Sequence, residues 1–273
     1  MSMRNFNMGI EAKGRRGRMG GVPPAISRKA EAYQRRTEPP YDADDIISAY
    51  ETGCMSAEKK PSHRGLEITF GVDVDEVLRC LLCKMVALYN ELLPPNERIT
   101  VDDVKDFVVE KSFPKVEKIT GMNPSEWFFK LHGPELFRLS DSVDGAVDAV
   151  NRLRKYGKVI IISYQKSAEN KIDTIEWLEQ HNVKYDGICF VKDKSAVHTD
   201  YLIDDNDWNF LGCNADKGVL ISAPYNMDKN LEDILINSNC FEMSRFSSLS
   251  DFVDWYEEEE RAKESQCFVE NFL

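Results

Sequence analysis

The sequence has no hydrophobic run long enough to cross a membrane. Its 273 residues contain no apolar stretch near the roughly 18 residues that a transmembrane helix requires, and the first residues lack the short apolar segment of a secretory signal. We therefore expect a soluble, cytoplasmic protein without a membrane partner. The content of 42% hydrophobic and 30% charged residues is typical of a globular chain of about one to two domains.

The cysteines and histidines are too scattered along the sequence to indicate a disulfide network or a metal site. Seven cysteines, an odd number, lie in apolar segments, which argues against a network of disulfides. Cys80 and Cys83 have the Cys-x-x-Cys spacing of redox and zinc sites, but no second ligand pair accompanies them. We therefore expect buried, reduced thiols at these two positions. The four histidines show no mutual spacing that indicates a metal site.

Basic residues are in the minority, except near the N-terminus. The chain holds 35 Lys and Arg against 47 Asp and Glu, a formal net charge of -12, yet residues 1–66 hold 12 basic and 8 acidic side chains. The acidic remainder disfavours broad binding to nucleic acid. Residues 1–66 also lack apolar periodicity, which indicates a basic, mostly disordered arm. This arm is either a solvated tail or a contact for nucleic acid, an acidic partner or the acidic body itself.

From residue 67 onward, short β-rich apolar runs alternate with helical patterns. This alternation predicts βαβ units and a parallel sheet. The predicted strands cover residues 66–72, 158–162, 187–191, 201–203 and 218–222. The predicted helices that pack on the sheet cover residues 144–156, 168–181 and 250–263.

The first two predicted strands are separated by about 85 residues, more than a single crossover helix requires. The intervening segment has helical patterns, which we place at residues 76–93, 101–109 and 123–130. We therefore predict a core formed by residues 67–91 and 139–273. Residues 92–138 are then a small helical cap above the carboxyl edge of the sheet.

Polar groups suited to phosphate and metal chemistry follow the predicted strands. In an open parallel sheet, ligands bind beyond the carboxyl ends of the strands. The groups in question are Asp73, Asp75, Ser163, Lys194, Asp204 and Asp205. Carboxylates about 4 Å apart repel by roughly 4 kcal/mol per pair at an effective dielectric constant near 20, so such a cluster needs a cation. Oxygen ligands favour Mg²⁺, and a neighbouring lysine offsets the remaining charge.

In their order along the chain, these residues resemble the four motifs of the haloacid dehalogenase superfamily of phosphatases. The runs Val159 to Ser163, Trp177 to His181 and Leu202 to Asp205 are similar to those of the cytosolic-type 5'(3')-deoxyribonucleotidases. The resemblance covers about residues 67–226. It implies a Rossmann-like core with a helical cap inserted after the first strand, in agreement with the long gap between the first two strands.

The resemblance also implies roles for individual residues. Asp73 is the expected nucleophile, which forms an aspartyl-phosphate, and Asp75 is the expected general acid and base. The implied Mg²⁺ site consists of the Asp73 carboxylate, the Asp75 backbone carbonyl and Asp205, with Asp204 orienting the site. Ser163 and Lys194 are expected to bind the phosphoryl oxygens.

Some positions near the motifs differ from the family's residues, and others have more than one possible role. Glu76 stands where the family usually has glycine, and Tyr164 stands where the deoxyribonucleotidases carry a small hydroxyl residue. Arg79 either meets the phosphate or pairs with Glu76. For stacking on a base, the candidates in the cap are Trp127 and Phe128, together with Phe107, Phe113 and Phe129.

The residues at the strand ends and the resemblance together imply a Mg²⁺-dependent hydrolase of phosphomonoesters, and the resemblance implies that it acts on nucleoside monophosphates, most of all deoxyribonucleotides. The first alternative is a phosphatase for another small molecule or a polynucleotide end on the same core. The second is a non-catalytic phosphate-binding or structural module of a larger assembly. A homodimer is compatible with each of these hypotheses.

Overall fold

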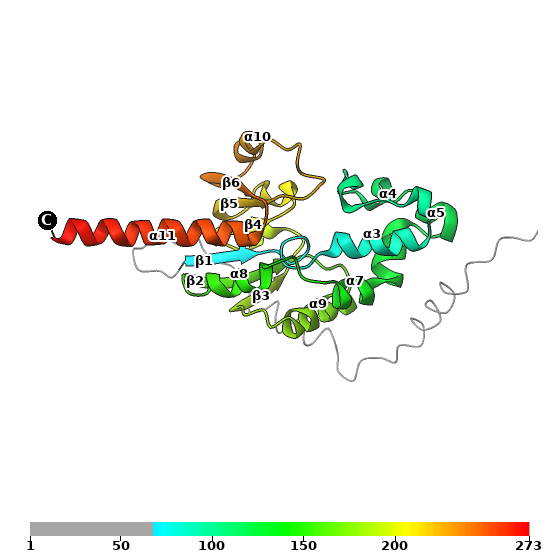
Figure 1. The fold of residues 1–273 in the computed structure, drawn as a ribbon, viewed down its shortest axis with the longest axis horizontal. Coiled ribbons are helices and arrows are strands. Elements are labelled where there is room, and N and C mark those ends of the chain that lie inside the picture. The colour runs from blue at the N-terminus through cyan, green and yellow to red at the C-terminus, as the bar shows by residue number, and fades with distance from the viewer. Residues whose placement is uncertain (1–67, 273) are drawn as a thin grey trace, which may run out of the picture. The chain divides into compact units, whose positions relative to one another are not determined.

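The computed structural model of the chain describes residues 68–272, and it describes side chains up to residue 266. The predicted arm at residues 1–66 lies outside the described residues. Within them, a six-stranded parallel sheet has the order β3-β2-β1-β4-β5-β6 (Figure 1). The strands are β1 (Ile68–Val72), β2 (Gly157–Ser163), β3 (Gly187–Phe190), β4 (Thr199–Asp204), β5 (Ala215–Ile221) and β6 (Glu242–Phe246). The prediction of an α/β fold with a parallel sheet is confirmed.

Helices pack on both faces of the sheet because the buried strands present apolar side chains on each side. One face packs against α8 (Ala146–Leu153), α9 (Ala168–Gln180) and α11 (Leu249–Phe272). The other face packs against η5 (Asp207–Phe210) and α10 (Leu231–Ile236). These two cores fix the strands whose ends carry the candidate site.

A helical segment connects β1 to β2 and has a hydrophobic core of its own. It begins with α3, which extends beyond the end of β1 (Figure 1). Its elements are α3 (Leu81–Glu91), η1 (Pro95–Glu97), η2 (Val101–Asp103), α4 (Val109–Ser112), α5 (Lys115–Thr120), α6 (Pro124–Glu126), η3 (Trp127–Leu131, a π-helix) and α7 (Gly133–Leu139).

Two helices of this segment differ from their predictions. The helix predicted over 76–93 begins only at Leu81, because Glu76 N donates to Arg79 O (2.8 Å) and closes a turn before it. The prediction of a helix over 101–109 is wrong, because only the short 3₁₀ turn η2 (Val101–Asp103) forms at its start. In that turn Thr100 and Asp103 cap each other, and Phe107 is 56% exposed rather than packed in a helical stripe.

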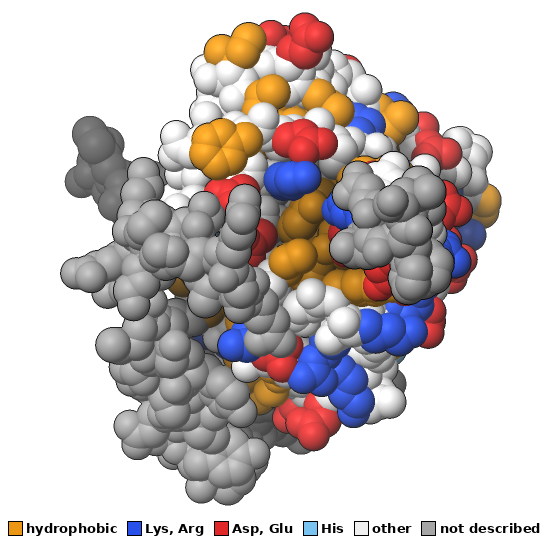
Figure 2. Space-filling view, turned by 90° about the vertical axis from the view of Figure 1, so that its left-hand side faces the viewer, with side chains coloured by type: hydrophobic (Ala, Val, Ile, Leu, Met, Phe, Trp, Pro, Cys, Tyr) orange, Lys and Arg blue, Asp and Glu red, His pale blue; other side chains and the backbone are white. Residues whose placement is uncertain are grey.

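One face of the described surface carries mixed charges. On the face drawn in Figure 2, acidic and basic side chains are interspersed and do not form a patch of a single sign. In the described part of the chain, no helix is both long and apolar enough to span a bilayer.

Candidate active site

The candidate site lies where the central strands β1 and β4 end. Val72 at the end of β1 is paired with Ile203 of β4, and Asp73 N donates to Ile203 O (3.0 Å). Asp73 and the pair Asp204–Asp205 therefore leave neighbouring parallel strands at nearly the same level. Because both strands are central and buried, the sheet fixes the position of these carboxylates.

Three carboxylates and one lysine form a buried cluster at this edge. Asp73, Asp204 and Asp205 each offer an oxygen, and these oxygens all lie within 4.8 Å of one another. Lys194 Nζ lies 2.5 Å from Asp204 Oδ2 and 3.0 Å from Asp73 Oδ1. Burial by itself lowers the pKa of Lys194, but Asp204 and Asp73 raise it above its ordinary value. The lysine is therefore protonated, and if all three carboxylates were ionised the cluster would carry two negative charges in excess.

The electrostatics of this cluster fit a divalent cation. Burial raises the pKa of Asp73 to about 7, although Lys194 opposes this shift, and burial together with Asp204 raises the pKa of Asp205 well above its ordinary value. Asp73 Oδ1 lies near Lys194 Nζ, yet no hydrogen bond with good geometry reaches this buried oxygen. An oxygen-only set with an unsatisfied carboxylate is a suitable ligand set for a hard cation.

The two aspartates at the end of β4 have different partners. Asp204 accepts hydrogen bonds from Asn206 N (2.9 Å) and from Asn209 Nδ2 (2.9 and 3.1 Å), in addition to its contact with Lys194. Its oxygens are therefore already engaged. Asp205 accepts a hydrogen bond from the Tyr225 hydroxyl. Asp204 is thus suited to orient Lys194, whereas Asp205 is more available as a ligand.

The Asp75 side chain is not part of this cluster and has partners of its own. Its Oδ1 accepts hydrogen bonds from Arg79, and its Oδ2 accepts one from Gln165 Nε2 (2.9 Å). Arg79 is fully buried and does not line the cavity, and its ion pair is with Asp75 rather than Glu76. Both alternatives for Arg79 that the sequence left open are therefore wrong. An ion pair four residues apart within a turn was the signal that could have identified this contact.

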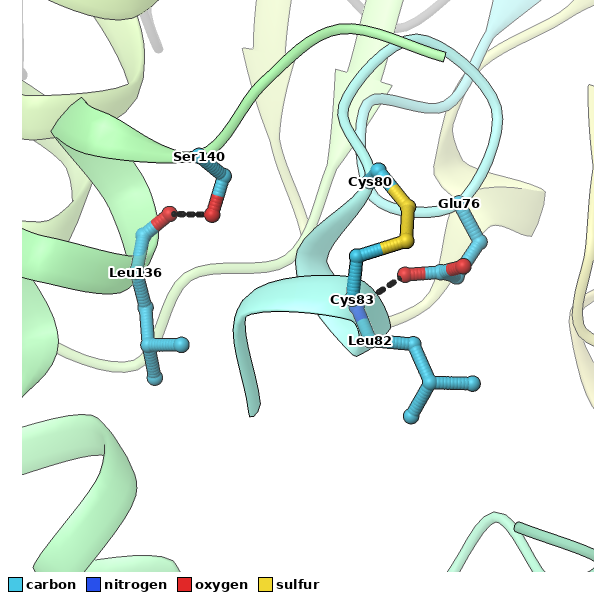
Figure 3. The surroundings of a disulfide bond; sticks show 6 residues. All are labelled: Glu76, Cys80, Leu82, Cys83, Leu136 and Ser140. Carbon is cyan, nitrogen blue, oxygen red and sulfur yellow. Dashed lines mark hydrogen bonds between the residues drawn. A yellow bond between two sulfur atoms is a disulfide. The ribbon is translucent and has the colours of Figure 1, made fainter. Parts of the chain in front are cut away.

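Glu76 adopts a backbone conformation that glycine tolerates best. Its φ of 58° lies in the left-handed region, which costs a side chain about 1–2 kcal/mol. The Glu76 carboxylate accepts a hydrogen bond from Leu82 N in the first turn of α3, as Figure 3 shows. Burial raises its pKa to about 7, although the hydrogen bond from Leu82 opposes this shift. The carboxylate is therefore anchored to α3, on the wall of the cavity.

Cys80 and Cys83 form a disulfide beside this hydrogen bond (Figure 3). The expectation of buried, reduced thiols at these positions is wrong, since Cys80 is only half-buried and Cys83 is exposed. Cys80 caps the N-terminus of α3 and Cys83 lies in its first turn, which brings their Cα atoms within 5.4 Å, a normal separation for a disulfide. Cys213 and Cys240 are buried free thiols with Sγ atoms 3.1 Å apart.

A cavity of about 690 Å³ joins the edge of the sheet to the helical segment. The predicted residues Asp73, Asp75, Ser163, Lys194 and Asp205 all line it. From the helical segment, its lining includes Phe107, Phe113 and Phe129. The structure therefore places the motif residues and these aromatic side chains around the same cavity.

Two of the predicted substrate contacts are not brought to this cavity. Trp127 and Phe128 are 1% and 0% exposed, belong to the core of the helical segment and do not line the cavity. We therefore withdraw them as stacking partners. They form the start of η3, where aromatic side chains at adjacent positions turn into the core and stack edge-on with ring centroids 4.7 Å apart.

Several lining residues were missed or only noted in the sequence. Gln165, Lys166 and Lys192 line the cavity near the motif residues, and so does Tyr164, which is 49% exposed. Gln165 and Lys166 follow β2 within three residues of Ser163. Their position directly after a strand end was the signal that could have identified them.

Comparisons with known proteins agree with this geometry. The family described as "5' nucleotidase, deoxy (Pyrimidine), cytosolic type C protein" matches residues 67–242. A 5'(3')-deoxyribonucleotidase of Clostridium acetobutylicum is 28% identical over 169 residues, which is 59% of this chain and 86% of that protein.

Solved structures are similar at low identity. A haloacid dehalogenase-like protein of Agrobacterium tumefaciens has a TM-score of 0.48 and 16% identity, and the match covers 72% of this chain and 100% of that chain. The L-2-haloacid dehalogenase of Xanthobacter autotrophicus has a TM-score of 0.46 and 10% identity, with 70% of this chain and 99% of that chain covered.

Proposed function

Because the chain belongs to the cytosolic type C family of deoxy (pyrimidine) 5'-nucleotidases, we propose that it hydrolyses deoxyribonucleoside monophosphates through an aspartyl-phosphate with the help of Mg²⁺. Membership of this family makes the chain a phosphoric monoester hydrolase of the 5'-nucleotidase type. Our proposal adds three points to this membership: the chemical route, the metal and the identity of the nucleotide.

One observation supports the route above all others. A buried carboxylate, Asp73, lies on the wall of the cavity with a protonated lysine, Lys194, 3.0 Å from its Oδ1. A carboxylate at the base of a cavity can attack a phosphorus atom, while the lysine binds the phosphoryl oxygens and offsets their charge. Ser163 lies on the same cavity wall and adds a hydroxyl donor.

The proposed reaction has two halves, with Asp73 as the nucleophile and Asp75 as the general acid and base. In the first, an Asp73 oxygen bonds to phosphorus, the bond from phosphorus to the nucleoside oxygen breaks, and Asp75 gives its proton to that oxygen. In the second, Asp75 takes a proton from water as the water oxygen bonds to phosphorus. The bond between Asp73 and phosphorus then breaks and inorganic phosphate leaves.

Three aspartates can hold a divalent cation at this site. We propose that the Asp73 and Asp205 carboxylates and the Asp75 backbone carbonyl hold Mg²⁺, with Asp204 orienting Lys194. When bound, the ion would neutralise charge on the phosphoryl group. The hydrogen bonds that already occupy Asp204 support its assignment as an orienting residue.

The helical segment supplies the proposed selectivity. A cavity of about 690 Å³ falls in the range of small-molecule sites; the aromatic side chains of its lining suit a base, and its lysines suit a phosphate. In place of Trp127 and Phe128, we propose Phe107 and Phe129 as the base contacts. We also keep residues 92–138 as a cap over a core of residues 67–91 and 139–273.

We propose the cytoplasm as the compartment, since the matching family is described as cytosolic. In that compartment, the disulfide between Cys80 and the exposed Cys83 would meet cellular thiol reductants.

The test measures phosphate release from a panel of deoxyribonucleoside and ribonucleoside 5'- and 3'-monophosphates, with Mg²⁺ or with a chelator. We expect release that requires the metal, is fastest with deoxyribonucleotides and disappears in Asp73→Asn. Asp148→Asn, at an exposed position of α8, is the matched control and should keep its activity.

Two outcomes would contradict the proposal. Undiminished turnover by Asp73→Asn would exclude the aspartyl-phosphate. Turnover of other phosphomonoesters without turnover of nucleotides would favour a phosphatase for a different substrate, and binding of phosphate without any turnover would favour a non-catalytic module.

A further inference from the structure

Arg79 lies in the turn that follows Asp75 and is completely buried. Its Nε and Nη2 atoms donate to Asp75 Oδ1 at 2.9 and 2.6 Å. Of the residues that the structure describes, Asp75 is the one carboxylate that forms an ion pair with Arg79. The guanidinium therefore acts on the substrate only through Asp75.

The two oxygens of Asp75 have different surroundings. Oδ1 faces two N–H donors of Arg79, whereas Oδ2 accepts one hydrogen bond from Gln165 Nε2 (2.9 Å). Gln165 and Asp75 line the cavity, but Arg79 does not. Oδ1 is thus held on the side of the protein interior, and Oδ2 lies beside a group on the cavity wall.

The chemistry of a carboxyl group makes this difference important. A protonated carboxyl has a single O–H, and an oxygen that already accepts two N–H groups is a poor place for it. The proton therefore belongs on Oδ2. There it can face the amide oxygen of Gln165, because the amide group offers both a donor and an acceptor.

We propose that Arg79 is a positioning residue, which holds Asp75 so that Oδ2 exchanges the catalytic proton. This inference rests on the proposed function, because it assigns Asp75 as the general acid. In the first half of the reaction, the Oδ2 proton passes to the leaving oxygen as its bond to phosphorus breaks and the bond between Asp73 and phosphorus forms. In the second half, Oδ2 takes a proton from the attacking water.

Arg79 is itself held from two helices. Its Nη1 donates to Phe137 O of α7 (2.5 Å), and its Nη2 contacts Thr174 Oγ1 of α9 (3.3 Å). The guanidinium also lies 5.1 and 5.4 Å from the ring centroids of Phe137 and Trp177. Only a planar group with several fixed N–H donors makes these contacts together, so lysine cannot replace it fully.

The choice of leaving group separates a positioning role from a merely structural one. A nucleoside leaves as an alkoxide that needs a proton, whereas p-nitrophenolate leaves as a stable anion. The test measures release of the leaving group in a single turnover with excess enzyme and Mg²⁺, from a deoxyribonucleotide and from p-nitrophenyl phosphate. Single turnovers isolate the first half of the reaction from the hydrolysis that follows.

In Arg79→Met, we expect nucleoside release to slow about 10- to 100-fold, while the first release of p-nitrophenolate stays within a few-fold of the wild type. Arg79→Lys should show the same split with a smaller loss and serves if the methionine variant fails to fold. Arg152→Met is the matched control, since Arg152 pairs with Asp254 and Glu257 outside the cavity and its loss should produce no split.

Equal losses with both substrates would show that Arg79 is merely structural and would overturn the inference, as would unchanged release from both by a folded variant. Failure of the proposed function is visible earlier and separately. In that case, the wild-type protein would itself release no leaving group from the deoxyribonucleotide.

Discussion

Asp73 shows how a single residue can be unfavourable for folding and useful for function. Its carboxylate is buried beside Asp204 and Asp205, and Lys194 compensates only part of their charge. In proteins, loss of one partner from a buried ion pair typically costs about 3–5 kcal/mol, because a charge is left uncompensated. The carboxylate charge that Lys194 leaves uncompensated should destabilise the fold in the same way, and we expect a bound cation to offset part of this destabilisation.

This electrostatic balance predicts how stability depends on pH and on metal. Burial raises the pKa of Asp73 from its ordinary 3.8 to about 7, so the folded state binds more protons than the unfolded state between these values. The stability of the metal-free protein should therefore fall as the pH rises from about 4 to above 7. At pH 8, Mg²⁺ at about 100 times its Kd should add roughly 2.7 kcal/mol to the free energy of unfolding. The same Mg²⁺ concentration should add less at pH 5.5, where protons compete for the carboxylates and raise the Kd.

Thermal unfolding with Mg²⁺ or a chelator at the two pH values measures this difference. Asp205→Asn removes one proposed ligand and should abolish the shift in Tm caused by the metal. Equal shifts at both pH values in the wild type, or an unchanged shift in Asp205→Asn, would mean that the ion binds elsewhere.

At the scale of elements, the sequence predicts buried strands better than exposed segments. Five of the six strands, among them the edge strand β3, were predicted, because each contains a run of apolar residues that is mostly buried. The edge strand β6 was missed, since Glu242–Phe246 mixes charged and apolar side chains that are at most half-buried. The predicted helix at 101–109 failed for a similar reason, because the aromatic Phe107 faces the cavity rather than a core.

The arrangement of strands and helices also explains why the candidate site was predicted only in part. Asp73, Ser163, Lys194 and Asp205 lie at or shortly after the ends of strands, and parallel strands bring their ends together whatever the details of the side chains. Contacts made by the helical segment depend on how its short helices turn. Trp127 and Phe128 therefore could not be distinguished from Phe107 and Phe129 by residue type alone.

Gly157 provides a test of how closely β1 and β2 approach. A Cβ atom at this position would lie 2.0 Å from Ile68 O in the backbone of β1, the residue with which Gly157 is paired. Gly157→Ala should therefore force the strands apart and reduce the free energy of unfolding by about 2–3 kcal/mol, measured by urea denaturation.

Gly187→Ala is the matched control for this substitution, since its Cβ would meet only the end of the Ile160 side chain at 3.1 Å. We expect it to cost less than half as much. Similar losses at the two positions would contradict the close approach at Gly157.

At the scale of the whole molecule, the site and the family match occupy the same part of the chain. The match begins at residue 67, and every proposed catalytic or metal-binding residue lies between Asp73 and Asp205. The family resemblance deduced from the motifs is confirmed, whereas the basic arm is not part of that match. Its role stays a prediction.

Deletion of residues 1–60 tests whether the arm contributes to chemistry. The truncated chain should keep phosphate release within a few-fold of the full chain, because the site residues and the strands that carry them are all retained. Circular dichroism of both proteins controls for folding. A folded truncation without turnover would mean that the arm takes part in catalysis or in substrate binding.

The central position of β1 also affects how the chain is made. β1 ends at Val72, but its neighbours in the sheet begin only at Gly157 and Thr199. On the ribosome, the apolar strand Ile68–Val72 must therefore wait unpaired while the more than eighty residues that precede β2 emerge, and it gains its second neighbour, β4, only later. A nascent chain that stops before Asp204 has neither a complete sheet nor a complete site, and its exposed β1 is a natural ligand for a chaperone.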